Sequence, residues 1–326
     1  MLTLRCLLLF LSLGIPASGA AAEPACPACP ACPSETRDIV RRSGAHGLIN
    51  PILDVESSIE FKELRPFKYK VQALIEQKIK VGAVSHVSVY FRDLENGPLF
   101  GFNEREKFSP ASMMKVPLLM AAMRRAAQAP AFFSRRVRYE QEQVVDAATL
   151  VPSNLEPGKD YSLEELVQSM ITTSDNHAAI AVYNAVGTEA LDQVYRDLGI
   201  LIPKVRGPGD DMTVREYATF FRILYNAAYL DKDRSQKALE FLSESEFEDG
   251  LVAGVPPEVV VAHKFGERSF VGSKVRQLHD CGIVYFKPQP YVLCVMTRGE
   301  DPAWLAGVVK DISRLVYAEV SSQAKP

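Results

Sequence analysis

The chain has little net charge, few histidines and no glycine-rich loop, and each shortage excludes a class of function. Its 37 Lys and Arg nearly balance 40 Asp and Glu, so no nucleic-acid partner is expected. The five His show no metal-ligand spacing, and His279 and Asp280, adjacent in a predicted strand, point to opposite faces and form no dyad. The stretch GPGDDM lacks the third glycine of a dinucleotide-binding loop. Neither a metal nor a nucleotide cofactor is therefore expected.

Long apolar runs are absent beyond the N-terminus. Residues 1–22 contain a single Arg5, an apolar run from Leu7 to Ile15 and small residues up to Ala22, which is the pattern of a secretory signal peptide. The apolar run is short for a membrane span. We therefore expect export to the periplasm or the extracellular space, or membrane anchoring if the signal is not cleaved.

Cysteine is scarce and unevenly placed. Cys26, Cys29 and Cys32 recur every third residue in PACPACPACPSE, so they would share one edge of a polyproline II rod. Such a stripe could form intermolecular disulfides, bind a soft metal in a reducing compartment, or simply belong to a stiff spacer. Cys281 and Cys294 lie in apolar strands, where we expect buried small hydrophobic side chains and no bridge.

Hydrophobic periodicity divides the rest of the chain into helices and strands. A helix is predicted over 65–81, and a hairpin joins strands at 86–94 and 98–102. Helical patterns fill the middle at 110–128, 162–173, 177–186, 188–199, 213–230 and 234–245. Strands return at 258–266, 278–286 and 291–299, and a last helix runs from Pro302 to about Val320.

This order predicts an α+β fold. Two early and three late strands are most economically joined in one five-stranded antiparallel sheet, flanked by the terminal helices, with the helical block inserted as a second lobe. A site is expected in the cleft between the lobes. The predicted organisation is a signal peptide (1–22), a Cys-Pro-rich linker (23–36) and one domain (37–326), in which residues 65–109 and 255–320 form the α/β lobe and 110–254 the helical lobe.

The stretch SPASMMKVPLL places a serine and a lysine on one face of a helix. Ser109 and Pro110 fit the N-cap and first helical positions, so Ser112 would lie in the first turn, where free N–H groups favour a developing oxyanion. Lys115 follows at i+3 among apolar neighbours. Desolvation favours its neutral form, which can accept a serine proton.

Two features weaken this motif when it is taken alone. Pro117 has no N–H, which leaves the carbonyl of Met113 without its helical donor and predicts a kink. A second match, Ser322 to Lys325, lies in a polar tail and is read as meaningless. The alternative for Ser112 and its lysine is a helix start with a snorkelling side chain.

Two further motifs follow in order. TTSDNHAA contains Ser174, Asp175 and Asn176 between two predicted helices, and AHKFGERS contains Lys264 and Gly266 at the end of a predicted strand. The ordered set Ser-x-x-Lys, Ser-Asp-Asn and Lys-x-Gly resembles the class A β-lactamases and related penicillin-recognising serine hydrolases over roughly residues 65–320. The resemblance implies a two-lobed, cofactor-free enzyme that acts on a small-molecule substrate, a β-lactam or a peptidoglycan-like peptide.

The resemblance also implies catalytic roles. Ser112 would attack a carbonyl, Lys115 would take its proton, and Ser174 would relay a proton to the leaving nitrogen. For Asp175 we prefer a structural role, a hydrogen bond that holds the motif.

Substrate-binding roles are implied for four other residues. Asn176 would hydrogen-bond the substrate amide, and Lys264 would supply positive charge near the substrate carboxylate. Glu267, directly after Gly266, would offer its backbone N–H, paired with that of Ser112, as an oxyanion hole.

The chain departs from the family pattern in the third motif. Phe265 stands where the family offers a Thr or Ser hydroxyl to the substrate carboxylate, and a phenyl ring cannot make that contact. Ser269, Arg268 or Arg276 are the candidates to replace it.

The second departure concerns deacylation. The connection at 198–213 contains no Glu, only Asp210 and Asp211, whereas the family carries there the Glu that positions the deacylating water. We expect β-lactam hydrolysis through an acyl-enzyme on Ser112. The alternatives are a DD-peptidase-like or other peptide or ester acyl hydrolase, a slowly deacylating β-lactam or peptidoglycan sensor, and a scaffold that keeps the motifs without activity.

Overall fold

The computed structural model describes residues 48, 60–140, 150–202 and 212–323, which belong to one compact unit, residues 43–326. The predicted signal peptide and linker, with Cys26, Cys29 and Cys32, lie outside the described residues. So do Asp210 and Asp211. Within the described ranges, no helix combines the length and apolar character needed to cross a membrane.

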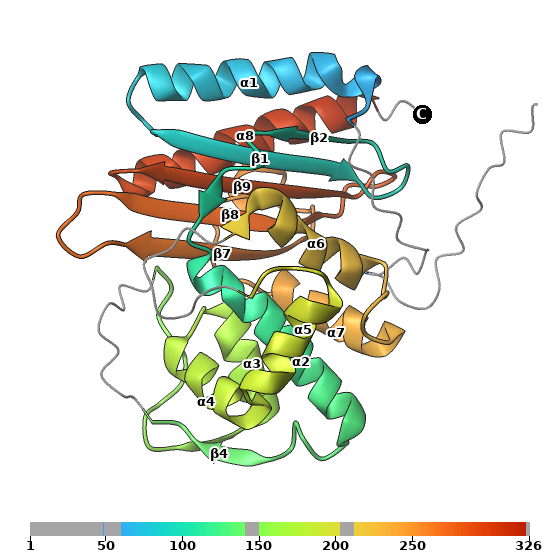
Figure 1. Cartoon of the computed structure of the whole chain (residues 1–326), viewed down its shortest axis with the longest axis vertical. Helices are drawn as coiled ribbons and strands as arrows, with labels where there is room; N and C mark the ends of the chain where they lie inside the picture. Colours follow the sequence, from blue (N-terminus) through green and yellow to red (C-terminus); the bar gives the residue numbers. More distant parts are fainter. Residues whose placement is uncertain (1–47, 49–59, 141–149, 203–211, 324–326) are drawn as a thin grey trace, which may run out of the picture. The chain divides into compact units, whose positions relative to one another are not determined.

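A five-stranded antiparallel sheet forms the centre of the α/β lobe, in the order β2-β1-β9-β8-β7. Its strands are β1 (His86–Asp93), β2 (Leu99–Phe102), β7 (Val261–Ser269), β8 (Arg276–Val284) and β9 (Tyr291–Gly299). Helices α1 (Arg65–Lys80) and α8 (Pro302–Gln323) cover one face (Figure 1). The predicted fold class is confirmed, and β7 lies at the sheet edge.

The remaining helices lie beyond the other face of the sheet (Figure 1). They are α2 (Lys115–Gln128), α3 (Leu163–Thr172), α4 (Asn176–Val186), α5 (Thr188–Asp197), α6 (Val214–Tyr225) and α7 (Lys232–Ser243). The capping boxes that Ser162 with Glu165 and Thr213 with Glu216 provide begin α3 and α6. These local signals explain why the helix starts could be read from the sequence.

Short elements complete the described fold: η1 (Lys62–Leu64), η2 (Ala111–Met114), η3 (Val252–Gly254), β3 (Lys107–Phe108), β4 (Arg136–Arg138), β5 (Asp160–Ser162) and β6 (Met212–Thr213). β3 pairs with β6, which ties the segment before the predicted nucleophile to the start of α6. β4 pairs with β5.

Two hydrophobic cores lie on the two faces of the sheet. One contains Val71 and Ile75 of α1 together with Ile312 of α8, and the other contains side chains of α2 and α6 such as Leu119 and Phe220. Alternate residues of each strand enter different cores because strand side chains point alternately to the two faces.

The expectation for Cys281 and Cys294 is half wrong. Both side chains are fully buried, as expected, but they form a disulfide. They are directly opposed partners in the register of β8 and β9, with Cα atoms 4.0 Å apart. Strand register depends on long-range pairing, and a shift of one residue would have placed the two side chains on opposite faces.

Candidate active site

The serine and lysine of the first motif meet through a tight 3₁₀ turn. Residues Ala111–Met114 form η2, and α2 begins at Lys115. Side chains at i and i+3 eclipse in a 3₁₀ turn, which brings Lys115 Nζ to 3.2 Å from Ser112 Oγ. Ala111 has a φ of +48°, a left-handed conformation that strains the turn just before the partly exposed Ser112.

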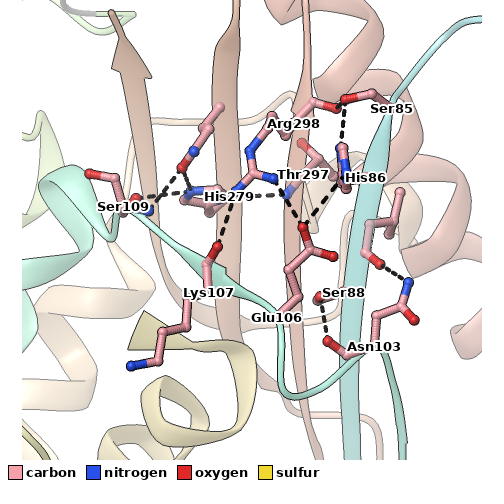
Figure 2. A network of polar contacts seen from close by, with 12 residues as sticks. Ser85, His86, Ser88, Asn103, Glu106, Lys107, Ser109, His279, Thr297 and Arg298 are labelled. Atoms are coloured by element: carbon pink, nitrogen blue, oxygen red, sulfur yellow. Dashed lines mark hydrogen bonds and ion pairs between the residues drawn. The ribbon is translucent and has the colours of Figure 1, made fainter. Parts of the chain in front are cut away.

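The predicted N-cap role of Ser109 is wrong, because no side chain caps η2. Ser109 is instead held by its backbone: its N–H donates to Gln277 Oε1 at 2.9 Å, and its carbonyl lies 3.1 Å from His279 Nε2. Thr297 N–H donates to His279 Nδ1 at 3.1 Å, so the ring proton is on Nε2 and points to Ser109 (Figure 2). Strand β8 therefore fixes the chain three residues before Ser112.

The same network continues along the segment before the turn (Figure 2). Arg298 donates to Glu106 Oε1 and to the carbonyl of Lys107, each at 3.0 Å.

The side chains of His279 and Asp280 point to different sides of the sheet, as expected. Sequence reasoning missed that Asp280 binds His263 Nδ1 and the N–H of Leu251, both at 2.8 Å.

Lys115 Nζ is surrounded by four oxygens from two motifs. Besides Ser112 Oγ, it contacts Ser174 Oγ at 3.1 Å, the Ser174 carbonyl, and Asn176 Oδ1 at 2.7 Å. The Ser-x-x-Lys and Ser-Asp-Asn motifs thus form one cluster across about 60 residues of sequence.

The surroundings of Lys115 favour a neutral amine near neutral pH. Its side chain is 6% exposed, and burial lowers its pKa to about 7 against the opposing charge of Asp175. A neutral amine has two N–H donors and one lone pair. The Ser174 carbonyl and Asn176 Oδ1 can only accept, so they take both donors and leave the lone pair to a serine hydroxyl.

Asp175 holds the second motif in place. Its Oδ1 accepts from Ala178 N–H at 2.8 Å as the N-cap of α4, and its Oδ2 accepts from Tyr139 Oη at 2.7 Å and from Ser153 Oγ. These contacts agree with the structural role preferred for Asp175. Ser174, the residue before Asp175, has a φ of +59°, a conformation that non-glycine residues rarely adopt.

The third motif reaches the nucleophile turn along the edge strand β7, which contacts η2. A Cβ on Gly266 would lie 2.8 Å from the Pro110 carbonyl and 2.8 Å from Met113 Cγ, so no other residue fits without moving the turn. Glu267 follows directly, and burial raises the pKa of its carboxyl.

Lys264, the lysine of the third motif, lies in the edge strand β7. Its side chain is completely buried, and its Nζ donates to the Phe265 carbonyl at 3.0 Å and lies 3.9 Å from the centre of the Phe265 ring. Within the described chain it makes no hydrogen bond to Ser174. Burial, then the charge of Lys115, lowers the pKa of Lys264 well below its ordinary value, against an opposing pull from Asp280.

The structure shows the surroundings of Phe265 and of the three candidates to replace its missing hydroxyl. The Phe265 ring packs in the core shared with α1 and α8, stacked on Phe247 at 4.2 Å. Arg276 donates to carbonyls of its own hairpin loop, and Arg268 lies over the ring of Phe270. Ser269 ends β7, four residues beyond Phe265.

Comparison with known proteins identifies the family. The sequence profile of the Beta-lactamase enzyme family matches residues 66–320, most of the chain. The chain belongs to this family. A β-lactamase of Streptomyces albus G is 26% identical over 253 residues, which is 71% of this chain and 79% of the relative.

Solved structures of penicillin-binding proteins and class A β-lactamases have a similar fold. An acyl-enzyme complex of a PBP-A mutant with penicillin G has a TM-score of 0.65 at 22% identity, over 78% of this chain and 97% of that one. A variant of the class A β-lactamase of the last common ancestor of Gram-negative bacteria has a TM-score of 0.65 at 25% identity, over 78% and 98%. The chain is a β-lactamase-like serine hydrolase.

Proposed function

We propose that this family member hydrolyses β-lactams through an acyl-enzyme on Ser112, with Lys115 as the base. The observation that carries the proposal is the 3.2 Å contact between Ser112 Oγ and an amine whose pKa is about 7 and whose two N–H donors are already engaged. The protein relatives named above, a β-lactamase and a penicillin acyl-enzyme, support this substrate class.

In the proposed acylation step, Lys115 receives a proton from Ser112 and later returns one to Ser174. Lys115 takes the proton of Ser112 while Oγ forms a bond to the lactam carbonyl carbon. The lactam C–N bond then breaks, and Ser174 passes a proton to the leaving nitrogen and is reprotonated by Lys115, 3.1 Å away. The product of this step is an ester on Ser112 and a ring-opened amine.

The proposed binding roles use the groups around this pair. Asn176 would bind the substrate amide, and the N–H groups of Ser112 and Glu267 would form an oxyanion hole that Gly266 keeps close to the turn. Lys264 would supply positive charge near the substrate carboxylate. Burial lowers the pKa of this amine, and the negative charge of a bound carboxylate would favour its protonated form.

A second candidate is a DD-peptidase-like or other peptide or ester acyl hydrolase. It is favoured by the absence of any Glu at 198–213, because rapid hydrolysis of a β-lactam acyl-enzyme needs a second base. The third candidate, a sensor that stays acylated, follows from the same absence.

Turnover of a chromogenic cephalosporin tests the proposal. We expect many turnovers per protein molecule, abolished in Ser112→Ala. A single stoichiometric burst with a stable adduct would support the sensor, and release of D-Ala from a cell-wall peptide without any β-lactam adduct would support the peptidase. No reaction of Ser112 with either reagent would contradict the catalytic proposal.

Export and cross-linking through Cys26, Cys29 and Cys32 are also proposed, on the sequence alone. The protein recovered from the exported fraction should have the mass expected after removal of residues 1–22 or 1–20.

The cross-linking predicts dimers on a non-reducing gel, and these should vanish when all three cysteines are replaced by Ser. A monomeric wild type under oxidising conditions would contradict the cross-linking.

A further inference from the structure

The helix that carries the nucleophile contains a proline where an N–H is normally used. Pro117 is the third residue of α2, and the carbonyl that its N–H would bind is that of Met113, four residues earlier and next to Ser112. Proline has no N–H, so the regular helical hydrogen bond to the Met113 carbonyl is missing. The N–H of Lys115, where η2 ends, is shared between the Met113 and Ser112 carbonyls.

Tyr217 of α6 supplies the donor from another part of the chain. Its hydroxyl donates to the Met113 carbonyl at 2.7 Å in a buried setting, 104 residues away in sequence. The ring is completely buried and packs against Phe220 and Phe221. Burial raises the pKa of Tyr217 well above its ordinary value, so the hydroxyl keeps its proton and remains a donor.

From this contact we infer that Tyr217 is a positioning residue for the nucleophile turn. Its hydroxyl fixes the turn at Met113, from α6. Gln277 and His279 of β8 fix the turn at Ser109. Gly266 of β7 packs closely against it. The inference rests on the proposed role of Ser112. Without the hydroxyl, the turn loses its hydrogen bond to α6 at Met113, and the spacing between Ser112 Oγ and Lys115 Nζ loosens.

Tyr195 of α5 provides a matched control. Like Tyr217 it is almost completely buried and packs edge-on against Phe220, at 5.9 Å between ring centres. Its hydroxyl has no hydrogen-bond partner among the described residues. Removing each hydroxyl therefore makes the same chemical change at two buried tyrosines, and only one of them contacts the nucleophile turn.

The test is the rate at which benzylpenicillin acylates each variant, followed by intact mass at a temperature where circular dichroism shows every variant folded. At saturating benzylpenicillin we expect Tyr217→Phe to be acylated about tenfold more slowly than wild type, with the concentration for half-maximal rate unchanged. Tyr195→Phe should match wild type. Equal rates for Tyr217→Phe and wild type, or equal losses in both variants, would overturn the inference.

Restoring the missing N–H provides a rescue. Pro117→Ala returns a backbone donor to Met113, so in that background Tyr217→Phe should slow acylation by less than about twofold. A full tenfold loss in both backgrounds would show that the hydrogen bond is not the cause and would refute the role. If Tyr217→Phe alone does not fold, the double variant should fold, and its failure would also count against the inference.

A wild-type protein that is not acylated at Ser112 at all would refute the proposed function. That result is distinct from an acylated wild type whose rate is insensitive to Tyr217, which refutes only the positioning role.

Discussion

Lys115 and Lys264 are two buried lysines in neighbouring motifs, and their surroundings differ. Lys115 Nζ contacts four oxygens, two of which belong to serine hydroxyls that can exchange protons. Lys264 Nζ contacts one backbone carbonyl and the face of an aromatic ring. Neither of these neighbours can give or take a proton.

The comparison shows that burial is not sufficient to make a lysine a base. Desolvation is the largest cause of a lowered pKa at both residues. What distinguishes Lys115 is a hydroxyl within reach and two fixed acceptors that orient the lone pair. Among the described residues, Lys264 Nζ hydrogen-bonds only to a backbone carbonyl.

Replacing each lysine by Met gives the largest expected difference. Lys115→Met should slow acylation by about a thousandfold, because a positioned base contributes about 10²–10⁴ in rate. Lys264→Met should cost less, about 10- to 100-fold, the size of one charged hydrogen bond to the substrate. Adduct formation with benzylpenicillin, followed by intact mass, measures both rates. Equal losses would remove the distinction between the two residues.

Gly266→Ala moves the nucleophile turn without altering either lysine. The new Cβ would crowd the Pro110 carbonyl and Met113 Cγ, and the resulting displacement should slow acylation by about 10- to 100-fold. Gly307→Ala is the control, since nothing lies within 4 Å of its Cβ position in α8. That variant should acylate normally and gain about 0.5–1 kcal/mol in unfolding free energy. Normal acylation of Gly266→Ala would contradict the tight fit.

The pH dependence of acylation reports on Lys115. In the proposed mechanism the neutral amine is the base, and its fraction grows as pH rises through a pKa of about 7. The rate should therefore increase about tenfold per pH unit at acidic pH and level off above about pH 8. Stopped-flow or quenched mass measurements between about pH 5 and 9 test this. A rate that falls or stays constant over this range would assign the base elsewhere.

Asp175→Asn should give the smallest effect. The charge of Asp175 raises the pKa of Lys115, so removing it should shift the midpoint of the pH profile below that of wild type, by about one unit or less. Asp231→Asn changes the N-cap of α7 in the same way and should leave the profile unchanged. A shift to higher pH, or the same shift in both variants, would contradict the assignment.

Local patterns predicted most of the fold because their causes are local. The capping boxes at Ser162 and Thr213 mark helix starts within four residues, and strand alternation marks the sheet. The same holds for Ser112 and Lys115, which need only a turn of helix to meet.

Contacts between distant segments could not be predicted. The hydroxyl of Tyr217 reaches Met113 from another helix, and the Cys281–Cys294 bond depends on the register of two strands. Nor could the sequence predict that Lys264 Nζ donates to the Phe265 carbonyl.

Peptide mapping of the acylated protein tests the central claim most directly. After a brief reaction with benzylpenicillin, acid quench and trypsin digestion, the adduct should be found on the peptide of residues 108–115, which contains Ser109 and Ser112. It should persist in Ser109→Ala and vanish in Ser112→Ala. An adduct on any other peptide, or one that survives in Ser112→Ala, would contradict the account.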